Sequence, residues 1–257
     1  MATAPLPPIS SEISAAVEQT PPLSQIARIV NTFIAPNKTF TDLRRSAAWW
    51  APFLLVLAAT WGLNFTAGAK VGFEKIAENQ MQARPKQVER MDSMPPAERA
   101  RAMGFAAKIT AGIGYAFPAL QLLIMLIIAA INFGTLKLVA GVDISFGKIY
   151  AVLMYAGLPG VLKVVLAIIS LLAGASPDSF TMQNPVGSSL AYYLNPADSP
   201  FLYSLGTQLD IFLIWTLILT AIGFTCISKV KSGTAYAIVF GWWIFFTLLF
   251  SALALLG

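Results

Sequence analysis

The sequence predicts an all-α integral membrane protein, a bundle of about five transmembrane helices. Two observations lead to this fold class. Hydrophobic residues make up 57% of the 257-residue chain and charged residues only 11%, compared with roughly 25% charged residues in an average globular protein. The charges are also unevenly spread, because long uncharged stretches separate short charged ones. Such a chain has too few charges to cover a soluble surface of its size, which indicates that its uncharged stretches lie in lipid.

The long apolar stretches give five expected spans, each near or above the roughly 20 residues that a bilayer requires. The spans cover residues 49–68, 112–136, 149–174, 205–228 and 235–256. The second lies in an uncharged run longer than a bilayer requires, so we expect tilt or a kink there, with Pro118 as the kink point. Pro159 lies inside the third span.

The N-terminal region divides into a tail and a short helix. Residues 1–22 are rich in Pro, Ser, Thr and Ala and are expected to be a disordered tail, while residues 23–257 form a single membrane domain. The tail lacks the basic residues and apolar core of a secretory signal peptide. Apolar residues then recur at helical spacing from Leu23 to Ile34, which predicts an amphipathic helix with Arg28 opposite its apolar stripe. This helix either lies on the membrane surface or packs against the bundle.

A second short helix is expected over residues 40–48, after a break at Pro36 and a turn. It carries a basic pair directly into the first span, where two tryptophans follow. Aromatic and basic side chains of this kind gather at the boundary between lipid and water. We therefore interpret Arg44, Arg45, Trp49 and Trp50 as interfacial anchors.

Residues 69–108 are the polar exception, with eight basic and five acidic residues. A helical pattern is interrupted at Pro85, and a second helix is expected to begin near Pro95 and Pro96, since proline is tolerated in a first helical turn. We predict an extramembrane helical hairpin between the first and second spans. The connection over residues 175–204 holds no Lys or Arg and is expected to be an ordered loop near the interface.

The distribution of basic residues predicts the orientation of the chain in the membrane. They occur before the first span, between the second and third spans, and between the fourth and fifth. Because cytoplasmic loops carry an excess of Lys and Arg, we expect a cell-membrane protein with a cytoplasmic N-terminus and the C-terminus on the opposite side. The eight basic residues of 69–108 lie outside on this topology and argue against it.

The composition excludes several classes of activity. The chain has no histidine and one cysteine, Cys226, so imidazole catalysis, an internal disulfide and a cysteine-rich zinc site are excluded. No phosphate-binding GxxxxGK[ST] motif occurs. The basic residues form no dense block, which favours contact with anionic lipid over nucleic acid. We expect a protein that is not an enzyme and needs no cofactor or metal.

Two ionisable residues fall inside expected spans, where charge is costly: Lys163 in the third and Asp210 in the fourth. In one interpretation they form a structural pair that holds two helices in register. In the other they line a polar pathway, as in a permease or a transporter subunit. Few other polar residues accompany them, which favours the structural interpretation.

Several segments together carry a family resemblance. They are RIVNTFIAPNKTFTDLRRSAAWW before the first span, YAGLP at 155–159, NPVGSSLAYYL at 184–194 and LDIFLIWTLILTAIG at 209–223. In these segments the chain resembles the bacterial branch of the Ypt/Rab-interacting protein (YIP) domain family. The resemblance implies five spans, a cytoplasmic N-terminus and a C-terminus on the opposite side. Together with the lack of a catalytic constellation, it favours a non-enzymatic role in membrane organisation or in recruiting protein partners, for which the N-terminal region is available. Membrane lipids are the other expected partners.

Overall fold

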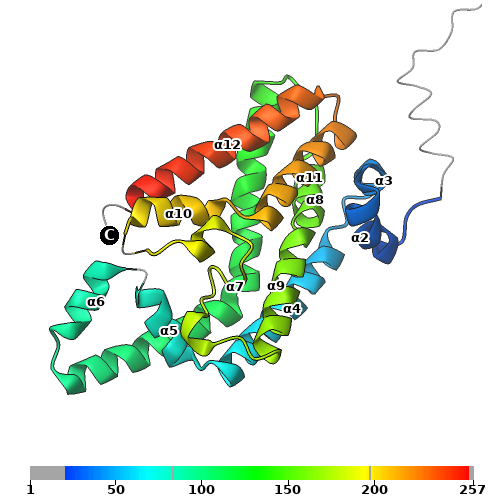
Figure 1. Ribbon diagram of the computed structural model, residues 1–257. Coiled ribbons are helices and arrows are strands. Elements are labelled where there is room, and N and C mark those ends of the chain that lie inside the picture. Colours follow the sequence, from blue (N-terminus) through cyan, green and yellow to red (C-terminus); the bar gives the residue numbers. More distant parts are fainter. Residues whose placement is uncertain (1–20, 83, 197, 255–257) are drawn as a thin grey trace, which may run out of the picture.

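The computed structural model describes residues 21–82, 84–196 and 198–254, and within these ranges all regular structure is helical. Figure 1 shows that α7 runs through the length of the molecule, while α2 and α3 lie together on one side. The predicted tail, residues 1–22, lies almost entirely outside the described residues. The helices are α2 (Gln25–Ile34), α3 (Pro36–Asp42), α4 (Trp50–Lys70), α5 (Phe73–Gln82), α6 (Pro85–Asp92), α7 (Pro96–Leu138), α8 (Phe146–Ala156), α9 (Leu158–Leu172), η1 (Pro177–Ser179), η2 (Leu190–Tyr193), α10 (Pro200–Gln208), α11 (Ile211–Ile227) and α12 (Ser232–Leu253).

Four segments of the described chain are long and apolar enough to cross a membrane. They are α4, α7, the continuous pair α8–α9 and α12. The molecule is therefore a multi-pass membrane protein, as the composition predicts. The remaining expected span, the fourth, contains α11, an apolar helix that is shorter than these candidates at 17 residues.

The fourth expected span, residues 205–228, is not one helix. The chain leaves helical geometry at Leu209 and Asp210, which separates α10 from α11. The sequence pattern placed Asp210 inside a spanning helix. In the structure Asp210 lies in the break and immediately precedes α11. The third expected span is interrupted more mildly, where α8 ends at Ala156 and α9 begins at Leu158. Pro159 lies in the first turn of α9, where its missing N–H removes no hydrogen bond.

The helix α7 is longer than any bilayer requires. Its 43 residues extend for about 64 Å at 1.5 Å per residue, roughly twice the hydrocarbon thickness. It begins at Pro96 as predicted, and Pro118 lies within it. Its first turns lie beside α5 and α6, at the end of the molecule away from α2 and α3 (Figure 1). Residues 73–108 thus form a helical projection from the bundle.

The helices that precede the first span differ from their prediction. The second one begins at Pro36 and ends at Asp42, rather than covering residues 40–48, because proline favours the start of a helix. Arg28 does not face away from the bundle, since it is 2% exposed. The apolar positions of α2 divide into two sets: Ile29 and Phe33 pack on the core, whereas others point outward.

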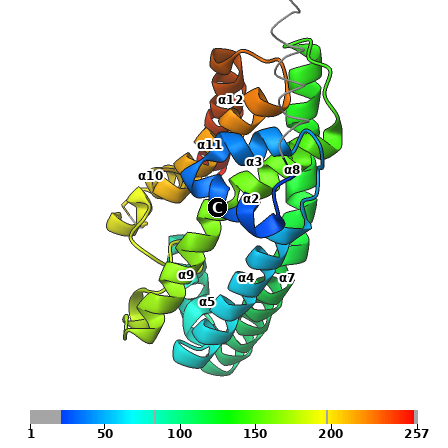
Figure 2. The ribbon, with the colours of Figure 1, turned by 90° about the vertical axis from the view of Figure 1, so that its right-hand side faces the viewer.

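The main core surrounds α8, whose residues Ile149–Ala156 are all buried. Phe40 of α3 is fully buried in this core beside α8 and α11. Gly223 allows the close approach, because a Cβ atom there would lie 2.3 Å from Cγ1 of Val152 and 3.3 Å from the Phe40 ring. Figure 2 shows α2 and α3 lying across α8 and α11. The N-terminal helices are therefore integral to the packed bundle.

Candidate functional site

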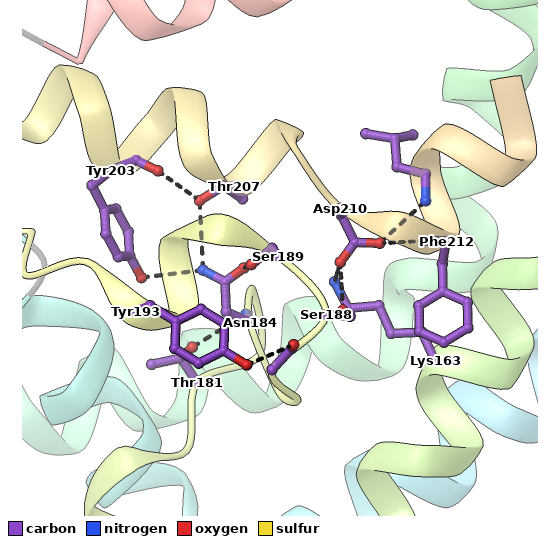
Figure 3. A network of polar contacts seen from close by, with 12 residues as sticks. Lys163, Thr181, Asn184, Ser188, Ser189, Tyr193, Tyr203, Thr207, Asp210 and Phe212 are labelled. Atoms are coloured by element: carbon purple, nitrogen blue, oxygen red, sulfur yellow. Dashed lines mark hydrogen bonds and ion pairs between the residues drawn. The ribbon is translucent and has the colours of Figure 1, made fainter.

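The two ionisable residues singled out in the spans lie against each other. Lys163 projects from α9, and its Nζ lies 2.9 Å from Oδ2 of Asp210 (Figure 3). The Asp210 side chain is 4% exposed, and the Lys163 side chain is 19% exposed. The lysine reaches a carboxylate that comes from a residue 47 positions later. Leaving either charge buried without its partner would be costly, so the pair joins α9 to the start of α11.

Asp210 is also the N-cap residue of α11. Its Oδ1 accepts hydrogen bonds from the backbone N–H groups of Phe212 and Leu213, at 2.9 and 3.1 Å. An aspartate at this position satisfies N–H groups that have no partner within the helix and favours the positive end of the helix dipole. Its Oδ2 accepts from the Ser188 hydroxyl as well as from Lys163. Both oxygens of the carboxylate are therefore already bound within the protein. We call Lys163, Ser188 and Asp210 the Asp210 cluster.

The cluster ties the loop between α9 and α10 to the break between α10 and α11. The Leu190 N–H donates to the Leu209 carbonyl and the Ile211 N–H to the Ser188 carbonyl, both at 3.1 Å. These two bonds make a short antiparallel bridge between Ser189 and Asp210. The backbone groups that the interrupted helix would leave unpaired are thereby satisfied, which the apolar surroundings require.

Asn184 holds the same loop to α10 (Figure 3). Its side-chain amide donates to the Tyr203 hydroxyl at 3.2 Å and lies 3.5 Å from the Thr207 hydroxyl. Its carbonyl oxygen accepts from Ser189 at 2.7 Å. Sequence reasoning identified none of these partners as site residues, although the segment 184–194 was one on which the family resemblance rests. The sequence feature that could have indicated them is a loop without Lys or Arg that carries polar residues at the expected membrane–water interface.

The Asp210 carboxylate is fully occupied by hydrogen bonds within the protein. The aspartate accepts four hydrogen bonds, and its lysine partner donates one of them. In the part of the chain that the structure describes, no three His, Cys, Asp or Glu residues lie close enough to hold a metal ion. The geometry therefore suits a fixed connection between α9, the loop and α11 better than a reacting group.

The expected interfacial anchors have different surroundings. The Trp49 ring packs inward at 5.2 Å from the Tyr150 ring, whereas Trp50 is 52% exposed. The Arg44 Nε donates to the Cys226 carbonyl at the end of α11, a favourable place for a cation. Arg45 is exposed at the start of the segment that leads to α4. Of the four expected anchors, Trp50 and Arg45 are thus exposed, whereas Trp49 packs inward.

A second polar cluster fixes α2 and α3 to each other. The Arg28 Nε donates to the Asp42 carboxylate at 2.7 Å. The Thr32 and Thr39 hydroxyls both donate to the Arg28 carbonyl, at 2.8 and 2.7 Å. We call these four residues the Arg28 cluster. It had no signal in the sequence pattern, because Arg28 and Asp42 belong to different helices.

The Arg28 cluster lies near α8, where the Tyr155 hydroxyl donates to Gln25 Oε1 at 2.6 Å. Two of the segments that carry the family resemblance contact each other, since the segment 184–194 is bound to the segment 209–223 through Ser188 and Asp210. The YAGLP segment is bound through Tyr155 to Gln25, which lies three residues before the N-terminal segment.

One family model covers most of the chain. The model of the Yip1 domain matches residues 30–253. The chain belongs to the Yip1 domain family. No curated protein and no solved structure gave a significant match. The whole Asp210 cluster lies within the matched Yip1 domain, as do Thr32, Thr39 and Asp42 of the Arg28 cluster, while Arg28 lies just before its first residue.

Proposed function

We propose that this Yip1 domain protein is a non-enzymatic membrane organiser whose α2 helix is inserted into the cytoplasmic leaflet. The proposal includes five crossings of a bacterial inner membrane, with α10 and α11 together making the fourth. Its support is the family membership, the four long apolar segments and the apolar character of α11.

One observation carries the proposal: α2 is amphipathic in the opposite sense to a helix on a water-soluble protein. Its polar residues Arg28 and Thr32 are 2% and 0% exposed, since they face the protein. Its outer face holds Ile26, Val30 and Ile34, which are 76%, 49% and 75% exposed. These three residues are four positions apart and form one stripe, which we call the α2 stripe. An outward apolar stripe on a membrane protein is best satisfied by lipid.

The charges near α2 support a position at the cytoplasmic surface. Lys38 is exposed just after the helix, and Lys229 and Lys231 follow the end of α11, beside which α3 packs. Lys137 and Lys148 border the connection between α7 and α8. Cytoplasmic loops of membrane proteins carry an excess of Lys and Arg, and each such cation near an anionic leaflet contributes about 1 kcal/mol of attraction to the membrane surface. The proposal therefore places the N-terminus in the cytoplasm and the C-terminus on the opposite side.

The mechanism follows from how α2 is held. The Arg28 cluster joins α2 to α3, and Phe40 fixes α3 in the core. A helix held rigidly at the level of the headgroups occupies area in one leaflet only, which favours curvature toward that side. Residues 1–22 are the region proposed for recruiting a cytosolic protein partner. Deleting them should remove such a partner from crosslinked membranes while leaving α2 in place.

The test compares vesicle shape with and without the α2 stripe. Full-length protein is reconstituted into anionic vesicles, and their shape is recorded by electron microscopy at matched protein density. The proposal predicts narrow or tubular vesicles with the natural protein and round ones with Ile26, Val30 and Ile34 replaced by Ser. The matched control replaces Leu123, Ile127 and Leu120 of α7, which are also exposed but lie within a spanning helix. Equal vesicle shapes for the natural protein and the α2 variant would refute the proposal.

The alternative function is a permease with a route near Lys163 and Asp210. It has less support, because the carboxylate is fully engaged and 4% exposed. Replacing Lys163 by Ala in a protein that still assembles would abolish solute uptake in a permease. In a structural pair the same change lowers stability and leaves solute flux unchanged.

A further inference from the structure

A cavity of about 640 Å³ lies between α5, α6 and the first turns of α7. Its volume is within the range of roughly 300–1,000 Å³ that small-molecule sites occupy. The cavity is separate from both polar clusters, and the membrane-organising role does not use it. Its walls begin at Val71 and Gly72, which directly follow α4. Because α4 is a candidate span ending at Lys70, the cavity lies where the bilayer meets water.

One part of the lining is apolar and adaptable. Its members are aliphatic or thioether side chains from α5, α6, α7 and the turn after α4: Val71, Met81, Val88, Met91 and Met103. Methionine side chains are flexible and polarisable, so surfaces rich in them accept apolar groups of different shapes. This wall suits the apolar body of a ligand that comes from the membrane interface.

The charged part of the lining leaves an excess of negative charge. Lys75 is bound by Glu78 at 3.3 Å and by Asp178 at 2.9 Å. Hydrogen bonds to these two acids raise the pKa of Lys75, so it stays charged and engaged. Arg99 is bound by Asp92 at 3.1 Å.

Glu74 is the carboxylate of this lining that has no ion-pair partner in the described part of the chain. The excess is notable because residues 69–108 carry eight basic and five acidic residues, a net positive charge. The surrounding segment would favour an anion, whereas the cavity itself presents a spare carboxylate beside an apolar wall. This combination matches a ligand with one positive charge and a bulky apolar body.

We infer that the cavity between α5, α6 and α7 binds lipophilic organic cations, with Glu74 as the counter-ion and the three methionines as the apolar wall. The site takes such a compound at the membrane surface, where amphiphilic cations concentrate. Charge, rather than apolar contact alone, selects the ligand, because two ions of the same shape and opposite charge differ in their electrostatic interaction with the lining, whose unpaired charge is the Glu74 carboxylate.

The test uses two ions of matched size and opposite charge, tetraphenylphosphonium and tetraphenylborate. Binding of each to the full-length protein in detergent is measured by equilibrium dialysis, with empty micelles as the blank. The inference predicts saturable binding of about one phosphonium per chain and no saturable binding of the borate. Equal binding of both ions, or no saturable phosphonium binding, would overturn it.

Variants then locate the site. Glu74→Gln should weaken phosphonium binding by about tenfold, the scale of one partly solvated charge pair. Val88→Trp should reduce binding by filling the cavity. Glu89→Gln is the matched control, since it removes a carboxylate from α6 that is not part of the lining. Unchanged binding in the folded Glu74→Gln protein, or an equal loss in Glu89→Gln, would contradict the assignment.

Discussion

Arg28 and Asp42 form an ion pair of 2.7 Å in which the two side chains are 3% and 7% exposed. Arg28 also donates to the Ser46 carbonyl at 3.3 Å, so one guanidinium links α2, the end of α3 and the segment that leads into α4. Burying two charges is tolerated because each satisfies the other. The pair therefore determines whether α2 stays fixed on the bundle.

Breaking this pair should release α2. Asp42→Ala leaves a buried guanidinium without its partner, which costs about 3–5 kcal/mol in comparable pairs. We expect faster protease cleavage within residues 21–48 while the remaining bundle stays intact, measured by limited proteolysis in detergent. Lys38→Ala, which changes an exposed charge nearby, should cleave at the natural rate. An unchanged cleavage rate for Asp42→Ala would show that the pair does not fix α2.

The contact between α11 and α8 should not tolerate a methyl group at Gly223. A Cβ there would lie 2.3 Å from Cγ1 of Val152, and overpacking of this kind costs typically 1–3 kcal/mol. Gly223→Ala should lower the melting temperature in detergent, and adding Val152→Ala should recover part of the loss. Gly241→Ala in α12 is the control, since nothing lies within 4 Å of a Cβ at that position.

The helices α4 and α7 meet at an equally tight position. The Asn64 side-chain amide donates to the Gly114 carbonyl at 3.0 Å, and a Cβ on Gly114 would lie 2.0 Å from Asn64 Oδ1. Gly114→Ala should therefore destabilise the protein by about 1–3 kcal/mol, measured by thermal unfolding. Gly112→Ala, two residues earlier and with open space around its Cβ, should be neutral. Equal melting temperatures for the two variants would contradict this packing.

The Asp210 cluster should be structural in its effects. Asp210→Ala removes the N-cap of α11, worth about 0.5–2 kcal/mol, and leaves Lys163 without its partner. We expect a larger loss of stability for this variant than for Ser188→Ala, which removes one hydrogen bond. The double change Lys163→Met with Asp210→Asn should be more stable than Asp210→Ala, because no charge is left buried. The order of the three melting temperatures tests the assignment.

The sequence predicted the bundle well because its signals are local. Long apolar runs located α4, α7, α8–α9 and α12, and the proline pair at 95–96 located the start of α7. These features depend on composition and on backbone chemistry within a few residues. They need no knowledge of distant contacts.

The site was less predictable because its partners are distant in the chain. The break at Leu209 and Asp210 is stabilised by Ser188 and Lys163, and neither is a neighbour in sequence. Arg28 looked like a solvent-facing residue, since a helical pattern shows which residues share a face but not which face is buried. The burial of Arg28 follows from Asp42, 14 residues later. Both the break before α11 and the burial of Arg28 therefore depend on side-chain contacts between different helices and loops.

The most direct test of the central claim is the depth of the α2 stripe in the membrane. Single spin labels are attached at Ile26→Cys and Ile34→Cys in a Cys226→Ser protein, reconstituted into anionic vesicles, with Lys86→Cys of the projecting helices as the water-exposed reference. Collision rates with oxygen and with a water-soluble nickel complex are then compared by electron paramagnetic resonance. The account predicts that oxygen dominates at Ile26 and Ile34 and nickel at Lys86. Nickel collisions at Ile26 and Ile34 as frequent as at Lys86 would contradict it.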